Sequence, residues 1–120
     1  MDNAHPIELQ APDISRWAAG NTGTPFVWRF DSGRPGPNVM VQALTHGNEI
    51  CGALALDWLL EQQTQWQVSQ GQLTLAFGNV AAYARWNPQE PDRSRYVDED
   101  LNRVWADETL FGTRDSVELR

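Results

Sequence analysis

The sequence contains no lysine, and its nine basic residues, all arginine, are outnumbered by sixteen aspartates and glutamates. The formal net charge is −7. Nucleic acids and anionic membrane surfaces are bound through clustered positive charge. We therefore expect neither a nucleic-acid partner nor a membrane partner. The few arginines are unevenly placed, because Arg85, Arg93, Arg95 and Arg103 lie in one short stretch.

Cysteine is nearly absent, and a long apolar run and a secretory leader are missing. Cys51 is the single cysteine, which rules out an internal disulfide and suits a reducing compartment. No apolar stretch is long enough to span a bilayer. The first ten residues, MDNAHPIELQ, hold no basic region followed by an apolar core, as a secretory signal would. These absences predict a cytoplasmic protein.

Apolar residues make up 41% of the 120 residues, enough for one globular domain with a modest core. The pattern predicts strands near residues 25–31, 38–45 and 72–78, and a mostly buried helix from about 48 to 62 with Asn48 as N-cap. The second strand is nearly continuous apolar sequence, as expected of a strand buried on both faces of a parallel sheet. Strand, helix and strand in this order predict an α/β fold in which the last two strands are parallel.

Two further predictions concern the tryptophans and the end of the chain. Trp28, Trp58 and Trp105 fall within predicted elements, so we expect them in the core, which argues against a sugar-binding surface of exposed indole rings. The last nine residues, GTRDSVELR, are typical of the start of another helix.

Two side chains of metal-binding type lie where the second strand meets the helix. His46 is at the carboxyl end of the strand, where ligands bind in open α/β sheets, and Glu49 follows three residues later. This spacing can turn both side chains toward one point, and both are zinc ligands. The alternative is structural: Glu49 favours the helix start, and His46 is a satisfied polar residue. Cys51 could serve as a thiol nucleophile, but small buried cysteines usually only pack.

The segment RYVDEDLNRVW gathers side chains suited to an anionic ligand. Arginine binds carboxylates through two parallel hydrogen bonds and asparagine adds a directed amide, so Arg95, Asn102 and Arg103 could hold a carboxylate. The alternative is a loop whose arginines pair with its acidic residues Asp92, Asp98, Glu99 and Asp100. For Arg93 we prefer that alternative.

The motifs THGNE before an apolar helix, GN after a strand, and RYVDEDLNRVW, in this order, resemble the N-terminal half of succinylglutamate desuccinylases and aspartoacylases. The resemblance covers about residues 38–106 by order, spacing and motif. Those proteins are zinc deacylases with the zinc-carboxypeptidase fold. The resemblance therefore implies the N-terminal part of a zinc-carboxypeptidase-like mixed or parallel sheet flanked by helices.

The resemblance also implies roles for the matching residues. His46 and Glu49 would bind Zn²⁺, and Arg95 would polarise the scissile carbonyl group. Asn102 and Arg103 would hold the carboxylate of a small anionic N-acyl amino acid, whose amide bond would be hydrolysed.

Asp100 would fix the loop or one of its arginines. The sequence departs from the family pattern at Val80, where many relatives have proline, and it offers no third zinc ligand and no general base. His5 precedes the first strand and does not match the missing histidine. We therefore expect residues 1–120 to be the N-terminal portion of a single catalytic domain, truncated at its C-terminus. Such a fragment would be inactive alone and would leave apolar sheet surface to be covered by self-association or by a partner.

The sequence thus predicts a zinc-dependent hydrolase acting on N-acyl amino acids. A metallocarboxypeptidase acting on small peptides is the near alternative. A binding or assembly domain that has lost its metal, and with it catalysis, is the alternative from a different class.

Overall fold

The computed structural model describes residues 6–120, and a three-stranded mixed sheet forms its centre. The strands are β1 (Val27–Asp31), β2 (Asn38–Ala43) and β3 (Gln72–Phe77), arranged in the order β1-β3-β2. The strands β2 and β3 run parallel and are connected through α1 (Ile50–Glu61), whereas β1 is antiparallel to β3. The predicted strands, the central helix and the parallel pairing are confirmed. His5 lies outside the described residues.

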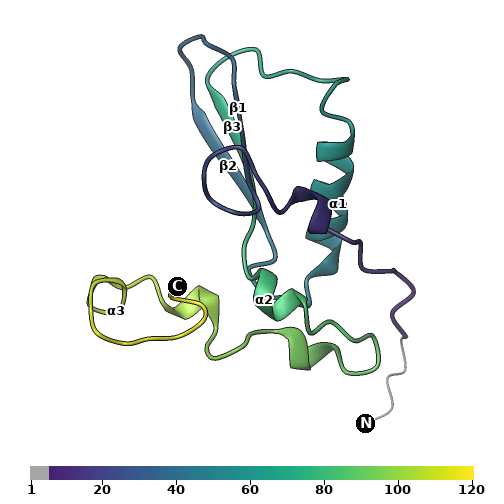
Figure 1. The fold of residues 1–120 in the computed structure, drawn as a ribbon, viewed down its shortest axis with the longest axis vertical. Coiled ribbons are helices and arrows are strands. Elements are labelled where there is room, and N and C mark those ends of the chain that lie inside the picture. Colours follow the sequence, from purple (N-terminus) through teal and green to yellow (C-terminus); the bar gives the residue numbers. More distant parts are fainter. Residues whose placement is uncertain (1–5) are drawn as a thin grey trace.

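The remaining elements are short helices: η1 (Ser15–Trp17), α2 (Val80–Tyr83), η2 (Pro91–Ser94), η3 (Leu101–Arg103) and α3 (Asp107–Leu110). Figure 1 shows α1 alongside the sheet, and the chain after α2 leading away into an arm that carries α3 and the C-terminus. Across residues 6–120, no helix combines the length and the apolar character needed to cross a membrane.

The end of the chain differs from the prediction, because residues 112–120 form no assigned helix. A single turn is present, in which the Arg120 N–H donates to the Ser116 carbonyl oxygen at 3.3 Å. The Val117 N–H donates instead to Asp98 Oδ2 at 2.9 Å, and Ser116 Oγ accepts from the Leu119 N–H. These side-chain acceptors satisfy backbone donors that a regular helix start would leave free.

The core lies between α1 and one face of the sheet. Its buried members from these elements include Ala53, Leu56, Leu60, Leu75 and Phe77. They lie on alternate positions of β3 and at helical spacing on α1, as the geometry of a strand and of a helix requires. Trp28 packs edge-on against Trp17 with ring centroids 5.9 Å apart, so the expectation that Trp28 joins the core is confirmed.

The prediction that β2 is buried on both faces is wrong. β2 is an edge strand of the described sheet, and Val39, Met40 and Val41 expose 48%, 58% and 42% of their surface. An apolar sequence indicates which surface prefers burial, but it does not supply the element that covers it. The expected uncovered apolar sheet surface is therefore present.

The prediction of a mostly buried helix is also wrong, because α1 buries only one face. Cys51 and Trp58 lie on the other face and are exposed, and Trp105 is exposed as well. Trp58 and Trp105 each expose 60% of their surface, so neither belongs to the core. The argument against an indole-lined sugar site therefore holds for Trp28 only.

A strained backbone corner ends β2. Leu44 has φ +61°, a left-handed conformation that is rare for a residue with a side chain, and it is buried. Two hydrogen bonds join this corner to the end of β3: Gly78 N–H to the Ala43 oxygen at 2.8 Å, and Asn79 N–H to the Leu44 oxygen at 2.7 Å. The carboxyl ends of the two parallel strands are thereby held together, two residues before His46.

Candidate functional site

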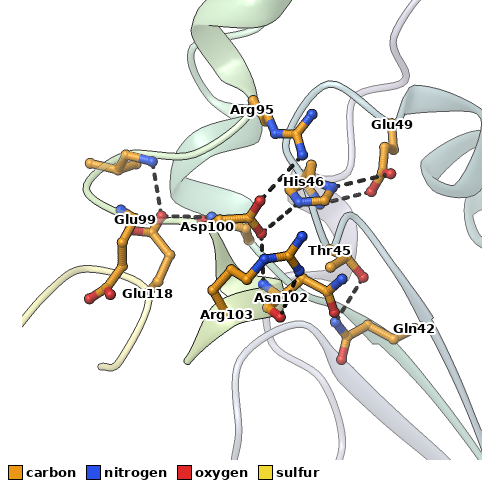
Figure 2. Close-up of polar contacts among 12 residues, drawn as sticks. Gln42, Thr45, His46, Glu49, Arg95, Glu99, Asp100, Asn102, Arg103 and Glu118 are labelled. Carbon is orange, nitrogen blue, oxygen red and sulfur yellow. Dashed lines mark hydrogen bonds and ion pairs between the residues drawn. The ribbon is translucent and has the colours of Figure 1, made fainter. Parts of the chain in front are cut away.

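The His46 imidazole lies between two carboxylates from distant parts of the chain. Its Nε2 is 2.8 Å from Asp100 Oδ1, and its Nδ1 is 3.3 Å from Glu49 Oε2 (Figure 2). The side chains of His46 and Asp100 are 12% and 17% exposed, whereas that of Glu49 is 49% exposed. Asp100 therefore holds the histidine on its buried side, and Glu49 lies on its more solvent-exposed side.

Glu49 is fixed by the turn that precedes α1. Its Oε1 accepts a hydrogen bond from the His46 backbone N–H at 2.8 Å. The predicted cap at Asn48 is wrong, because Glu49 occupies the N-cap position and its side chain makes no capping hydrogen bond to the helix. The carboxylate turns back toward His46, which leaves Oε2 beside the imidazole.

Gly47 is required by a close approach of two backbone segments. A Cβ atom at this position would lie 2.2 Å from the Ser94 carbonyl oxygen and 2.5 Å from the Tyr83 nitrogen. The Gly47 N–H donates to the Arg95 carbonyl oxygen at 3.1 Å. The glycine between the two predicted metal ligands therefore lets the 94–95 segment cross the turn and bring Arg95 to the site.

Asp100 connects three of the predicted site residues. Its Oδ1 accepts from the Asn102 N–H at 2.8 Å in addition to contacting His46, and Oδ2 lies 3.3 Å from Arg95 Nη2. The Asn102 N–H and then His46 lower the pKa of Asp100 from its usual 3.8 to about 2; burial opposes them, and Arg95 adds a smaller lowering. The carboxyl is therefore ionised at neutral pH and accepts hydrogen bonds only.

Asn102 and Arg103 lie on η3, of which Asp100 is the N-cap, and both are exposed. Arg103 Nη1 donates to the Asn102 carbonyl oxygen at 3.2 Å. Within residues 6–120, Arg103 forms no ion pair with Asp100 or Asp107, so its guanidinium fork is not engaged by a carboxylate there. Figure 2 shows both residues next to Asp100, which accepts from the Asn102 N–H.

Arg93 forms an ion pair, as preferred from the sequence. Its Nη1 lies 3.2 Å from Glu90 Oε2, an acidic partner outside the set that the sequence suggested. Arg93 therefore takes no part in the cluster around His46, whereas Arg95 contacts that cluster through Asp100.

The separation of the His46 and Glu49 donor atoms fits two ligands of one zinc ion. Ligands about 2.1 Å from a tetrahedral zinc are roughly 3.4 Å apart, close to the 3.3 Å between Nδ1 and Oε2. Because ionised Asp100 only accepts, the Nε2 atom of His46 carries the proton, so in a neutral ring Nδ1 is the unprotonated nitrogen, as a metal ligand requires. An imidazolium that donates at both nitrogens would satisfy the same contacts without a metal.

A third ligand is not supplied by this part of the chain. Within residues 6–120, no group of three or more histidine, cysteine, aspartate or glutamate side chains is placed to hold a metal ion. Cys51, the alternative nucleophile, is exposed rather than buried as the sequence argument supposed. The assignments of His46 and Glu49 to zinc, and of Arg95, Asn102 and Arg103 to substrate, remain predictions.

Sequence reasoning missed Glu118. Its carboxylate accepts hydrogen bonds from the backbone N–H groups of Val97, Asp98 and Glu99, and from Asn79 Nδ2. Burial alone would raise the pKa of Glu118, but these four donors lower it from the usual 4.5 to about 2. No local sequence signal could reveal this, because the partners lie 19 to 39 residues earlier in the chain.

Comparison with known proteins gives a family match. The profile of the family described as Succinylglutamate desuccinylase/Aspartoacylase catalytic domain matches residues 35–118. No curated protein and no solved structure matches the chain. The matched range includes the strand-to-helix corner at His46, the loop that carries Arg95 to Arg103, and Glu118.

Proposed function

This chain belongs to the succinylglutamate desuccinylase/aspartoacylase catalytic-domain family, a family of deacylating hydrolases, and from that membership we propose a zinc-dependent site that cleaves N-acyl amino acids. The observation that carries the proposal is the pair of contacts at His46. A carboxylate lies behind one ring nitrogen, and a second carboxylate lies beside the other at the separation of two zinc ligands.

In this proposal His46 Nδ1 and a Glu49 oxygen hold the zinc. Asp100 accepts the Nε2 proton, which fixes the ring's tautomer and orientation and raises the basicity of the binding nitrogen. Zinc bound there supplies a Lewis acid for the amide carbonyl group and lowers the pKa of a bound water. Catalytic zinc takes three protein ligands, so the described residues provide an incomplete site.

Arg95 and Arg103 have different roles in this proposal: Arg95 stabilises the transition state, and Arg103 binds the substrate. Arg95 reaches the cluster through Asp100 and is half exposed, so its remaining N–H groups can meet charge that develops on the carbonyl oxygen. The Arg103 guanidinium, which forms no ion pair within residues 6–120, and the Asn102 amide suit a carboxylate of the substrate. Holding that carboxylate would place the neighbouring amide near the zinc. A small-peptide carboxypeptidase would use the same groups on a different leaving group.

A non-catalytic binding or assembly domain is the second candidate. The absence of a third ligand group within residues 6–120 favours it, because two ligands alone do not make a catalytic zinc site. In this case the ion pairs around His46 would be purely structural, with an imidazolium bridging Glu49 and Asp100. The two candidates differ in whether zinc binds at His46 at all.

Zinc titration by isothermal calorimetry separates them. We expect weak binding of one zinc ion, lost in His46→Ala and Glu49→Gln and retained in Glu90→Gln, which removes a carboxylate from an exposed ion pair elsewhere. Zinc binding that is unchanged in His46→Ala would contradict the proposal. A deacylase is distinguished from a peptidase by comparing hydrolysis of an N-acyl amino acid and of a dipeptide in a protein that also supplies the third zinc ligand. We expect no turnover by residues 1–120 alone.

A further inference from the structure

The Glu118 carboxylate binds four N–H donors. Oε1 accepts from the backbone nitrogens of Asp98 at 2.8 Å and Glu99 at 3.0 Å. Oε2 accepts from the Val97 nitrogen at 2.9 Å and from Asn79 Nδ2 at 2.7 Å. Three consecutive backbone N–H groups that converge on one carboxylate form an anion-binding nest, here occupied by a side chain of the same chain. Figure 2 shows Glu118 beside the loop that continues into Asp100.

One of these donors is anchored to the sheet. Asn79 is buried at the carboxyl end of β3, where its backbone N–H donates to the Leu44 oxygen at 2.7 Å. Its side-chain oxygen accepts from the Ala82 N–H, which fixes the amide and directs Nδ2 toward Glu118. Glu118 therefore joins the carboxyl edge of the sheet to the 97–99 loop.

The same two segments are connected by two further contacts. Asp98 Oδ2 accepts from the Val117 N–H at 2.9 Å, and Arg114 Nη2 lies 3.2 Å from Glu99 Oε1. The 97–99 loop and the 114–118 segment are therefore bound to each other through backbone and side-chain groups on both sides. Asp100, which contacts His46, is the next residue of that loop.

We propose that Glu118 is a positioning residue for the candidate site: by holding the 97–99 loop to Asn79 it sets the contact between Asp100 and His46. The inference rests on the proposed function, because it takes His46 as a metal ligand. It adds a residue outside the set that the motifs indicate, and that residue touches neither His46 nor Arg95 in the hydrogen bonds described above.

Glu118→Gln is the informative variant because it preserves size while reversing half of the hydrogen bonding. One carboxylate oxygen becomes an NH₂ group, so two of the four N–H donors would face a donor. Asp115→Asn is the matched control, since Asp115 lies three residues away in the same segment and pairs only with Arg120 among the described residues. Both substitutions remove one negative charge.

The first measurement is amide hydrogen exchange by NMR. Exchange of the Val97, Asp98 and Glu99 amides should be at least tenfold faster in Glu118→Gln than in the wild type, and unchanged in Asp115→Asn. The second is the set of His46 ring nitrogen chemical shifts at constant pH, which report the bond from Nε2 to Asp100. These shifts should move in Glu118→Gln although the substituted residue does not touch the ring.

The third measurement is zinc affinity, analysed as a double-mutant cycle with Asp100→Asn. Loss of a carboxylate behind a metal-binding histidine costs about 10–100-fold in metal affinity. If Glu118 acts through Asp100, then Glu118→Gln should lose part of that factor, and the double variant should lose no more than Asp100→Asn alone. A merely structural role would lower the melting temperature and leave the affinity of the folded protein unchanged.

Each outcome decides the proposal. Unchanged exchange rates of the three amides overturn it. Faster exchange without any change in the His46 chemical shifts also overturns it, and so do fully additive losses of zinc affinity in the double-mutant cycle. If the wild type binds no zinc, the proposed function fails, while the exchange rates and the ring shifts still decide whether Glu118 positions Asp100. If Glu118→Gln does not fold, Glu118→Asp keeps the charge on a shorter side chain and should show intermediate exchange and shifts; wild-type values in that variant overturn the proposal.

Discussion

Asp100 Oδ1 lies 2.8 Å from Nε2 of His46, although the two residues are 54 positions apart in the sequence. The contact ties the loop that carries the predicted substrate arginines to the corner that carries the predicted metal ligands. It also sets the position of the histidine's ring proton. An ionised carboxylate can only accept a hydrogen bond, so the proton is held on Nε2. In a neutral ring the nitrogen facing Glu49 then carries no proton, as the proposed zinc site requires.

The first prediction concerns this contact. Asp100→Asn removes the anionic acceptor and can present an NH₂ group to the ring, so zinc affinity should fall by about 10–100-fold. Calorimetric titration measures the change, with Asp92→Asn as control because Asp92 is an exposed residue of the preceding η2. Equal zinc affinity in wild type and Asp100→Asn would show that the contact does not support a metal ligand.

The second prediction concerns acid. The pKa values of Asp100 and Glu118 are lowered to about 2 from 3.8 and 4.5, so both carboxyls bind protons less readily in the folded chain than in the unfolded chain. Their contribution to stability is therefore present above about pH 4.5 and is lost as the pH falls toward 2. The melting temperature, recorded between pH 6 and pH 2, should therefore fall as the pH is lowered.

The part due to Glu118 can be isolated by substitution. Glu118→Gln has no titratable group at this position, so its melting temperature should decline less between pH 4.5 and 2 than that of the wild type. Asp115→Asn, in an exposed ion pair, should follow the wild-type curve. Parallel curves for wild type and Glu118→Gln would contradict the assigned direction of the pKa shift.

The third prediction concerns Gly47. In Gly47→Ala the new Cβ would lie 2.2 Å from the Ser94 oxygen and 2.5 Å from backbone atoms of Ala82 and Tyr83, none of which can move cheaply. Overpacking of this kind costs about 1–3 kcal/mol of unfolding free energy. Urea denaturation measures the loss, and zinc affinity should fall as well, because the segment leading to Asp100 is displaced.

Gly52→Ala is the matched control for this substitution. Its Cβ would lie 3.2 Å from the Ala43 Cβ, a tight contact, while alanine favours the helix over glycine by about 1 kcal/mol. The control should therefore change stability much less than Gly47→Ala. A Gly47→Ala variant as stable as the wild type would show that the crossing of the 94–95 segment is more yielding than its geometry indicates.

The sequence predicted the parts that depend on local pattern. Apolar runs in the sequence located β2, α1 and β3, and the parallel pairing followed from the crossover. Burial was predicted less well, because hydrophobicity at Val41 or Trp58 records a preference for burial, whereas actual burial depends on which element covers the surface. The Asn48 cap failed for a related reason: which side chain closes a turn depends on competing contacts, here that of Glu49 with the His46 N–H.

The site was predicted at the level of motif and not of geometry. His46, Glu49 and Asp100 were identified as chemically active types, but only the fold shows that one imidazole contacts both carboxylates. Glu118 carries no pattern of its own, since its significance comes from N–H groups of a loop far earlier in the chain. Long-range hydrogen bonding of this kind is set by topology, which one sequence does not encode in any local window.

The last prediction concerns the substrate's charge. The Arg103 guanidinium forms no ion pair within residues 6–120, so it is free to bind a carboxylate with two parallel hydrogen bonds. Its loss in Arg103→Ala should weaken binding of an N-acyl amino acid by about 1.5–3 kcal/mol, the usual worth of hydrogen bonds to charged groups. Arg103→Lys restores the charge without the planar fork and should recover only part of this binding energy.

The control is Arg93→Ala, which breaks an exposed ion pair elsewhere and should have no effect on binding. Dissociation constants from NMR titration with the N-acyl amino acid and with its uncharged carboxamide analogue give the preference for the charged form. If Arg103→Ala leaves that preference unchanged, Arg103 does not bind the substrate carboxylate. A lower melting temperature with equal losses of affinity for both ligands would instead assign Arg103 a structural role.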